Sequence, residues 1–140
     1  MHRQLFAFGC GMGFLAVAGG AFGAHALKQV LTTEALVTWE IGARYLAYHA
    51  VPVLLVALHA DRLPRAGLSG WAFVLGAFIF TGSLWSLSLT GARWLGAVTP
   101  LGGVMFLGGW ATLAWAGLTR ANLSPTSAPK TGGDASTPPR

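Results

Sequence analysis

Four long apolar stretches follow one another along the chain, and the ionisable residues stand almost entirely at their ends. The stretches cover residues 5–26, 41–60, 68–89 and 99–118. A hydrocarbon core about 30 Å thick requires roughly 20 apolar residues in an α-helix, because each residue adds about 1.5 Å. Every stretch meets that length. The pattern therefore predicts an all-α integral membrane bundle of four transmembrane helices.

The second helix is predicted to begin before its apolar stretch. Thr32 is suited to cap a helix that starts at the next residue, and Glu34 in the first turn suits the positive end of the helix dipole. A helix from there to Ala60 would be roughly 42 Å long, so its first two turns are expected to form an interfacial extension. Pro52 removes one backbone hydrogen bond and is expected to bend the helix near Tyr48.

The fourth helix and the residues after it have clear local signals. Thr99 and Pro100 are predicted to be its N-cap and first position, since a proline there loses no helical hydrogen bond. Residues 94–98 are then a short piece that does not span. Residues 121–140 are rich in Ser, Thr, Pro and Gly and have no apolar face, which predicts a disordered tail. Residues 1–120 would form one transmembrane domain.

Small residues recur along the first helix at spacings of three and four, which places them on one face. In lipid there is little hydrophobic drive between helices, so close contact along small residues holds bundles together. We expect this seam to pack against neighbouring helices of the same chain, and dimerisation through it is the alternative. The seam consists of Gly9, Gly13, Ala16, Gly20 and Gly23.

A cluster of polar side chains is expected in the extracytoplasmic half of the bundle. Glu40, Arg44 and Tyr48 are four residues apart and line one face of the second helix. Charges inside a membrane are costly unless they are paired or wet, so a pair facing the bundle interior is expected. Two interpretations stay open: the cluster lies among lipid headgroups, or it forms a functional pocket or pathway. Its members are His25, Glu40, Arg44, Tyr48, His49, Ser83, Ser86, Arg93 and Thr99.

Charge and aromatic residues indicate the environment and the orientation. Only 9% of the residues are charged, against about 25% in soluble domains. The net charge of +5 comes from scattered basic residues without a basic stripe, which argues against nucleic-acid binding. Lys and Arg are more frequent at the end that holds both termini, so the positive-inside rule predicts cytoplasmic termini. Trp39 and Trp94 at one boundary, and Trp71 and Trp115 at the other, are predicted to form interfacial belts.

The chain has no motif for catalysis, cofactor binding or metal binding. Its four histidines lack the spacing of four that two metal ligands on one helix face require. It shows no activated nucleophile, paired carboxylates or phosphate loop. Cys10 is the single cysteine and forms no intrachain disulfide. We therefore expect a protein that is not an enzyme and uses neither cofactor nor metal.

Several short motifs, read in order, resemble a bacterial inner-membrane family called domain of unknown function 423, which is similar to eukaryotic transmembrane protein 256. The motifs are Gly20-Ala21-Phe22-Gly23-Ala24-His25, Arg44-Tyr45 with Tyr48-His49, Gly82-Ser83-Leu84, Arg93-Trp94-Leu95-Gly96 and Thr99-Pro100-Leu101-Gly102-Gly103. The resemblance covers about residues 5–118. It implies a four-helix inner-membrane protein and no catalytic role for any residue. Its motif positions His25, Arg44, Tyr48, His49, Arg93, Thr99 and Pro100 overlap the polar cluster. The chain departs from the family pattern at Ala26, Pro52 and Trp85.

Taken together, these features favour a structural or accessory component of the bacterial inner membrane. Its expected partners are the lipid bilayer and either a second copy or another membrane protein. The alternative function is an oligomeric transporter or channel for a proton, ion or small solute, with the polar cluster as its site.

Overall fold

The computed structural model describes residues 1–61 and 65–121. All described regular structure is helical, and four of the helices are long and apolar enough to cross a membrane, which confirms the predicted fold class. Of the segment predicted to be a disordered tail, Ala121 is the last residue of a helix and 122–140 lie outside the described residues. The elements are α1 (Arg3–His25), a short 3-10 helix η1 (Leu27–Gln29), α2 (Thr33–His59), α3 (Ala66–Thr90) and α4 (Leu95–Ala121).

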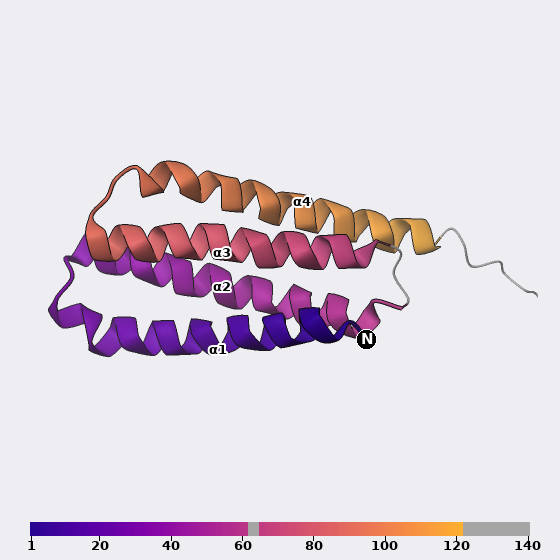
Figure 1. Cartoon of the computed structure of the whole chain (residues 1–140), viewed down its shortest axis with the longest axis horizontal. Coiled ribbons are helices and arrows are strands. Elements are labelled where there is room, and N and C mark those ends of the chain that lie inside the picture. The colour runs from indigo at the N-terminus through magenta and orange to yellow at the C-terminus, as the bar shows by residue number, and fades with distance from the viewer. Residues whose placement is uncertain (62–64, 122–140) are drawn as a thin grey trace, which may run out of the picture.

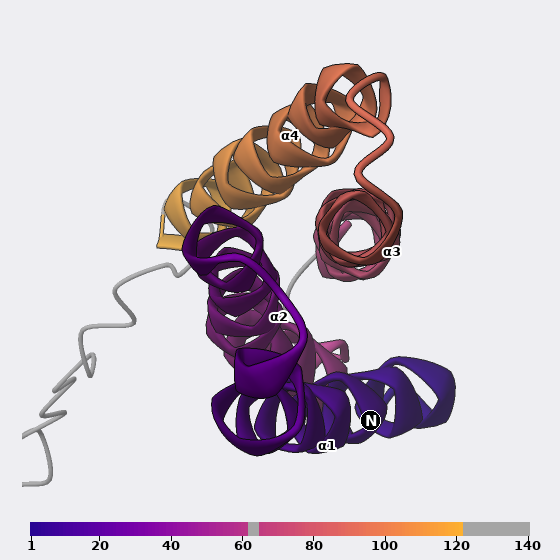
Figure 2. The same cartoon turned by 90° about the vertical axis from the view of Figure 1, so that its left-hand side faces the viewer.

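The four long helices alternate in direction and pack mainly with their neighbours in sequence. The N-terminus, the end of α2, the start of α3 and the end of α4 lie at the same end of the bundle (Figure 1). Viewed along the bundle, α1 and α4 lie at opposite edges with α2 and α3 between them (Figure 2). Contact is extensive for α1 with α2, α2 with α3, and α3 with α4, but slight between α1 and α3. The bundle is therefore an open row with a groove between α1 and α3.

The start of α1 is fastened to the end of α2. The backbone N–H of His2 donates to the carbonyl of Ala57 at 2.8 Å. The N-terminal ammonium of Met1 lies 2.6 Å from Oδ2 of Asp61. The hydrogen bond from this ammonium, together with its positive charge, holds the pKa of the Asp61 carboxyl below its usual value. These contacts fix the register of the first two helices at this end.

Two helix ends follow their local signals. The Thr32 hydroxyl accepts a hydrogen bond from the N–H of Ala35 at 3.2 Å, and Glu34 lies in the first turn of α2. At the C-terminal end of α3, Gly91 adopts a left-handed φ of 69°, and its N–H donates a hydrogen bond to the carbonyl of Leu87 at 2.8 Å. The predicted cap of α2 is confirmed.

The start of α4 differs from the prediction. The helix begins at Leu95, so the piece expected not to span is its first turn, which hydrogen bonds between residues three apart hold in place. Pro100 is its sixth residue and removes only the bond to the carbonyl of Gly96, while its fixed φ suits the helix. The Thr99 hydroxyl does not cap the helix but donates to the carbonyl of Leu95 at 3.2 Å.

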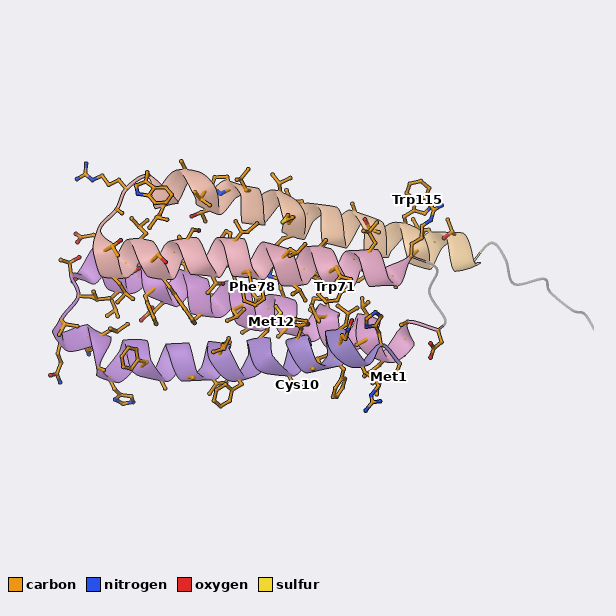
Figure 3. The ribbon with its side chains drawn as sticks, in the orientation of Figure 1. Met1, Cys10, Met12, Trp71, Phe78 and Trp115 are labelled. Atoms are coloured by element: carbon orange, nitrogen blue, oxygen red, sulfur yellow. The ribbon has the colours of Figure 1, made fainter. Side chains whose placement is uncertain are left out.

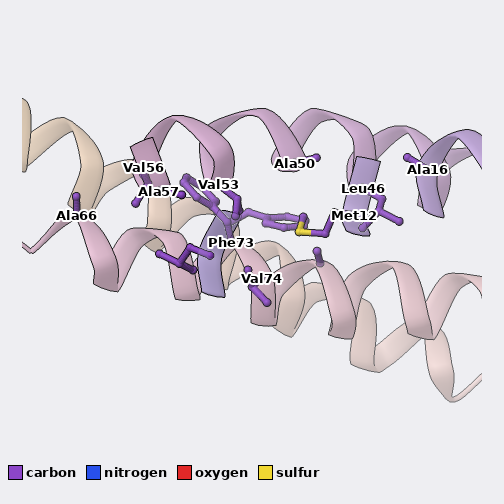
Figure 4. Close-up of a cluster of buried hydrophobic side chains, with 13 residues drawn as sticks. Met12, Ala16, Leu46, Ala50, Val53, Val56, Ala57, Ala66, Phe73 and Val74 are labelled. Atoms are coloured by element: carbon purple, nitrogen blue, oxygen red, sulfur yellow. The ribbon is translucent and has the colours of Figure 1, made fainter. Parts of the chain in front are cut away.

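The side chains are distributed as expected for a protein dissolved in lipid. The core lies mainly between α1, α2 and α3, around Met12, Leu46, Val53 and Phe73 (Figure 4), and Phe106 of α4 also belongs to it. Large apolar residues also cover the outside, and the side chain of Val17, for example, is 75% exposed. In water such a surface would cause aggregation, but lipid accepts it without penalty.

The backbones of α3 and α4 approach each other closely at two glycines, Gly76 and Gly102. A Cβ added to Gly102 would lie 2.6 Å from the backbone nitrogen of Phe80 and 2.7 Å from the carbonyl oxygen of Gly76. Because both neighbours are backbone atoms, no side chain could move to make room. The two helix backbones are therefore in direct contact, as small residues permit in membrane bundles.

Candidate functional site

The predicted polar cluster does not line one cavity. His25, Glu40, Arg44 and Tyr48 are exposed on the outside of the bundle, and so are Ser86 and Arg93. Buried positions are taken by His49 and Ser83, whereas Thr99 is half-buried. The cluster therefore divides into an outer group, which includes Glu40 and Arg44 of α2, and an inner group of three polar side chains, those of His49, Ser83 and Thr99.

His49 lies inside an aromatic cage built by α2, α3 and α4. Its ring stacks on Phe106 with centroids 3.5 Å apart and an angle of 5° between the planes. Its Nδ1 lies 2.8 Å from the carbonyl oxygen of Tyr45, and its Nε2 lies 3.4 Å from the indole nitrogen of Trp110. A carbonyl only accepts and an indole N–H only donates, so Nδ1 carries the proton and Nε2 accepts. Both nitrogens of the neutral ring are satisfied by packing partners.

The other two inner residues join α3 to α4. The hydroxyl oxygens of Ser83 and Thr99 are 2.8 Å apart. Each hydroxyl also lies within hydrogen-bond distance of a carbonyl of its own helix, that of Phe80 or Leu95. One hydroxyl donates its hydrogen bond to the other across the two helices, and the second hydroxyl donates to the backbone carbonyl of its own helix. Such a contact is typical of packing between membrane helices.

A pair of stacked tryptophans fastens α1, α2 and α3 together, and sequence reasoning missed it. Trp39 was expected in an interfacial belt, but it is only 6% exposed and donates from Nε1 to the carbonyl of Gly19 on α1 at 2.8 Å. Its ring stacks on Trp85 at a centroid distance of 4.5 Å, and the indole N–H of Trp85 donates to the Trp39 carbonyl at 3.1 Å. An added Cβ at Gly19 or Gly42 would come within 3 Å of the Trp85 ring. These glycines make the space that the second indole fills.

The other three belt residues are placed differently from Trp39. Trp94 and Trp115 are 68% and 65% exposed, as the belt prediction requires. Trp71 is half-buried and meets Phe8 of α1 edge to face with ring centroids 5.4 Å apart. The belt position of Trp94 and Trp115 thus stays a prediction, whereas neighbouring helices cover Trp39 and half-cover Trp71.

The small-residue seam of α1 only partly coincides with its contact face. Gly9, Ala16 and Gly23 are buried, but Gly13 and Gly20 are half-buried, and an added Cβ at either would meet nothing within 4 Å. Gly19 takes the place expected for Gly20. Adjacent glycines fit the same spacing rule, so the spacing does not decide which one meets a neighbour. The contact face consists of Leu5, Gly9, Met12, Ala16, Gly19 and Gly23.

The charged pair of α2 faces outward rather than into the bundle. Glu40 and Arg44 are exposed, and in the described part of the chain no ion pair within 4.0 Å involves either of them. Arg44 comes three residues after Ile41, where the apolar stretch of this helix begins, which is about 5 Å along the helix. A charged residue at the centre of a span costs roughly 3 kcal/mol on insertion scales, whereas a long side chain near the end of a span can reach the headgroups. The inner faces of α2 are occupied by contacts with α1, with α3 and, around His49, with α4, which leaves the outer face for these side chains.

Two pockets lie in the groove between α1 and α3, and both are apolar. Figure 3 shows Met12 of α1 and Phe78 of α3 at this groove. The pockets hold about 230 and 150 Å³ and share Met12, Leu15 and Phe78. Their one hydroxyl, that of Thr81, already donates to the carbonyl of Gly42. Acyl chains of the bilayer are suited to such a surface, whereas a polar solute finds no ligand there.

The comparisons with known proteins identify the family. The family described as "Protein of unknown function (DUF423)" matches residues 19–103. The chain belongs to the DUF423 family. The matched DUF423 segment contains both stacked tryptophans, the charged pair of α2, His49 and the contact between Gly76 and Gly102. The family resemblance indicated by the sequence motifs is confirmed.

Curated relatives of this DUF423 chain are membrane proteins. The UPF0382 membrane protein YwdK of Bacillus subtilis (strain 168) is 44% identical over 99 residues, covering 69% of this chain and 80% of the relative. The UPF0382 inner membrane protein YgdD of Escherichia coli (strain K12) is 36% identical over 117 residues, covering 79% and 86%. No solved structure matches the chain. The chain is thus a multi-pass inner-membrane protein of this family with four spans.

Proposed function

We propose that the protein is a non-enzymatic structural or accessory component of the inner membrane, which acts by assembling with other membrane-embedded chains through its outer surface. One observation carries the proposal. Glu40 and Arg44 lie on the outer face of a membrane-spanning helix, and in the described part of the chain neither forms an ion pair within 4.0 Å. An opposite charge on a neighbouring protein chain would stabilise both groups, because lipid chains do not solvate charge.

The use of the inner polar groups supports the same proposal. Among the residues that the structure describes, every buried side-chain nitrogen or oxygen has a hydrogen-bond partner. Hydrogen bonds between helices occupy the polar side-chain atoms of His49, Ser83 and the two stacked tryptophans. A transport site needs polar groups that face a wet cavity near the midplane. Here the interior polar groups serve packing, and the charged groups face away from the interior.

The proposal predicts that the outer face of α2 contacts protein. A photo-crosslinking residue in place of Tyr48, which is 59% exposed on that face, is expected to capture a protein chain in intact membranes. The adduct is measured by its mobility after denaturation. A face that only contacts lipid would give lipid adducts alone.

We also propose that both termini lie in the cytoplasm. Near the end with the N-terminus the sequence has Arg3, Arg62, Arg65, Arg120 and Lys130, whereas toward the opposite end it has Lys28, Arg44 and Arg93. The positive-inside rule places the more basic end in the cytoplasm. A fluorescent protein that folds only in the cytoplasm, fused after residue 140, is expected to fluoresce. An alkaline phosphatase fused at the same point is expected to be inactive, and the reverse result would invert the orientation.

A further inference from the structure

The exposed side of α2 forms a continuous stripe that neither α1 nor α3 covers. Its members follow one another at spacings of three and four residues, so they lie on one side of the helix. Both charged residues of the spanning part of α2 belong to it, followed by apolar residues toward the end of the helix. The stripe, called here the α2 outer stripe, consists of Glu40, Arg44, Tyr48, Val51, Leu55 and Leu58.

We propose that the α2 outer stripe docks a second copy of this chain, with Glu40 of each copy paired to Arg44 of the other. This inference rests on the proposed function and names its partner. The stripe carries one carboxylate and one guanidinium, and in the described structure neither is paired within the chain. A second copy supplies the counter-charge for both at once, because a symmetric interface presents the same surface from each side.

The geometry of insertion makes this pairing possible. Copies inserted with the same topology are related by a two-fold axis along the membrane normal, so equal residues meet at equal depth. Glu40 and Arg44 are four residues apart, which is about 6 Å along the helix. Two long side chains bridge that offset diagonally, and symmetry makes the pair twice. The interface would then contain two carboxylates and two guanidiniums and carry no net charge.

The apolar part of the stripe has the spacing of helices that pack side by side. Arg44, Val51 and Leu58 recur every seven residues, and Tyr48 and Leu55 stand between them. A seven-residue repeat keeps one seam facing a parallel partner helix along its length. The charged pair would therefore set the register at one end, and the apolar side chains would continue the contact.

The test uses charge reversal at the two positions. Differently tagged copies of the full chain are co-expressed, and their co-purification is measured in native lipid particles. Wild-type copies are expected to pair. Glu40→Arg and Arg44→Glu, each expressed alone, place four like charges in the interface and are expected to reduce pairing about tenfold. Co-expression of one variant with the other makes the charges complementary again and is expected to restore pairing.

Folding is controlled separately, because both positions are exposed. The melting temperature of each variant in detergent is expected to match that of the wild type. A chain with both reversals, Glu40→Arg and Arg44→Glu together, is expected to pair with itself, which shows that either arrangement of the charges works.

Three results would overturn the inference. The first is pairing that persists in both single variants, and the second is a mixture of the variants that fails to pair. The third is a Glu40→Arg chain that co-purifies more anionic lipid without losing a protein partner, since a lipid phosphate at Arg44 would gain from the second cation. If the Tyr48 crosslinker captures protein while wild-type copies do not pair, the inference fails and the proposed function stands.

Discussion

Replacing Gly102 by alanine is expected to destabilise the bundle by about 3 kcal/mol, the upper range for overpacking a well-packed interior. The new methyl group would lie 2.6 Å from the backbone nitrogen of Phe80 and 2.7 Å from the carbonyl oxygen of Gly76. Backbone atoms inside a helix do not move without moving the helix, so α4 would have to separate from α3. The free energy of unfolding in mixed detergent micelles measures the effect.

The adjacent glycine is a matched control. An alanine at Gly103 would meet no heavy atom within 4 Å, and it gains the better helix propensity of alanine. Gly103→Ala is therefore expected to change the stability by less than about 0.5 kcal/mol or to increase it. If both replacements had the same small effect, the direct backbone contact between α3 and α4 would be refuted.

Replacing Trp85 by alanine is expected to cost about 3 kcal/mol, in the range for removing a large aromatic side chain from a packed site. The change removes the stacking on Trp39, the hydrogen bond to its carbonyl and the contacts with Gly19 and Gly42. In lipid the stabilisation that is lost comes mainly from dispersion attraction, which depends on close contact rather than on the exclusion of water. The same unfolding measurement applies.

Two further variants separate the contribution of the Trp85 hydrogen bond from that of ring packing and control for the loss of any tryptophan. Trp85→Phe keeps a ring over Trp39 but loses the hydrogen bond, and it is expected to cost about 1 kcal/mol or less, as interhelical hydrogen bonds in membranes typically do. Trp94→Ala removes a tryptophan that is 68% exposed and is expected to leave the stability within about 0.5 kcal/mol. Equal losses for Trp85→Ala and Trp94→Ala would contradict the stacked pair.

The features predicted correctly from the sequence are those that depend on a short segment and its solvent. The length of the apolar stretches alone predicts the four helices, because lipid permits few other structures. The Thr32 cap has its signature within the first turn of the helix that it begins. Pro100 shows the limit of such signals, since a proline also fits inside the second turn of a helix that begins earlier.

The remaining features depend on which face of each helix meets which neighbour. Periodicity places Glu40 and Arg44 on the same face, but it does not say whether that face is turned inward. Trp39 is a residue type that is common in interfacial belts, yet its indole N–H donates a hydrogen bond to the carbonyl of Gly19 on another helix. The choice between Gly19 and Gly20 likewise follows from the position of the Trp85 ring. Such facts arise only when helices distant in sequence are placed together.

The bundle interior and the α2 outer stripe therefore have separate tasks. Glycines, stacked tryptophans and the caged His49 hold the helices at fixed positions. That rigid arrangement presents Glu40 and Arg44 on an outer face, where neither forms an ion pair in the described part of the chain. The central claim is that this face is a contact surface for protein.

Photo-crosslinking from position 48 in intact membranes tests that claim most directly. The matched control replaces Leu107, which is 71% exposed on α4 and has no charged residue on its face within two turns. The account predicts protein adducts from position 48 and lipid adducts from position 107. Lipid adducts alone from both positions, in a chain that melts like the wild type, would contradict it.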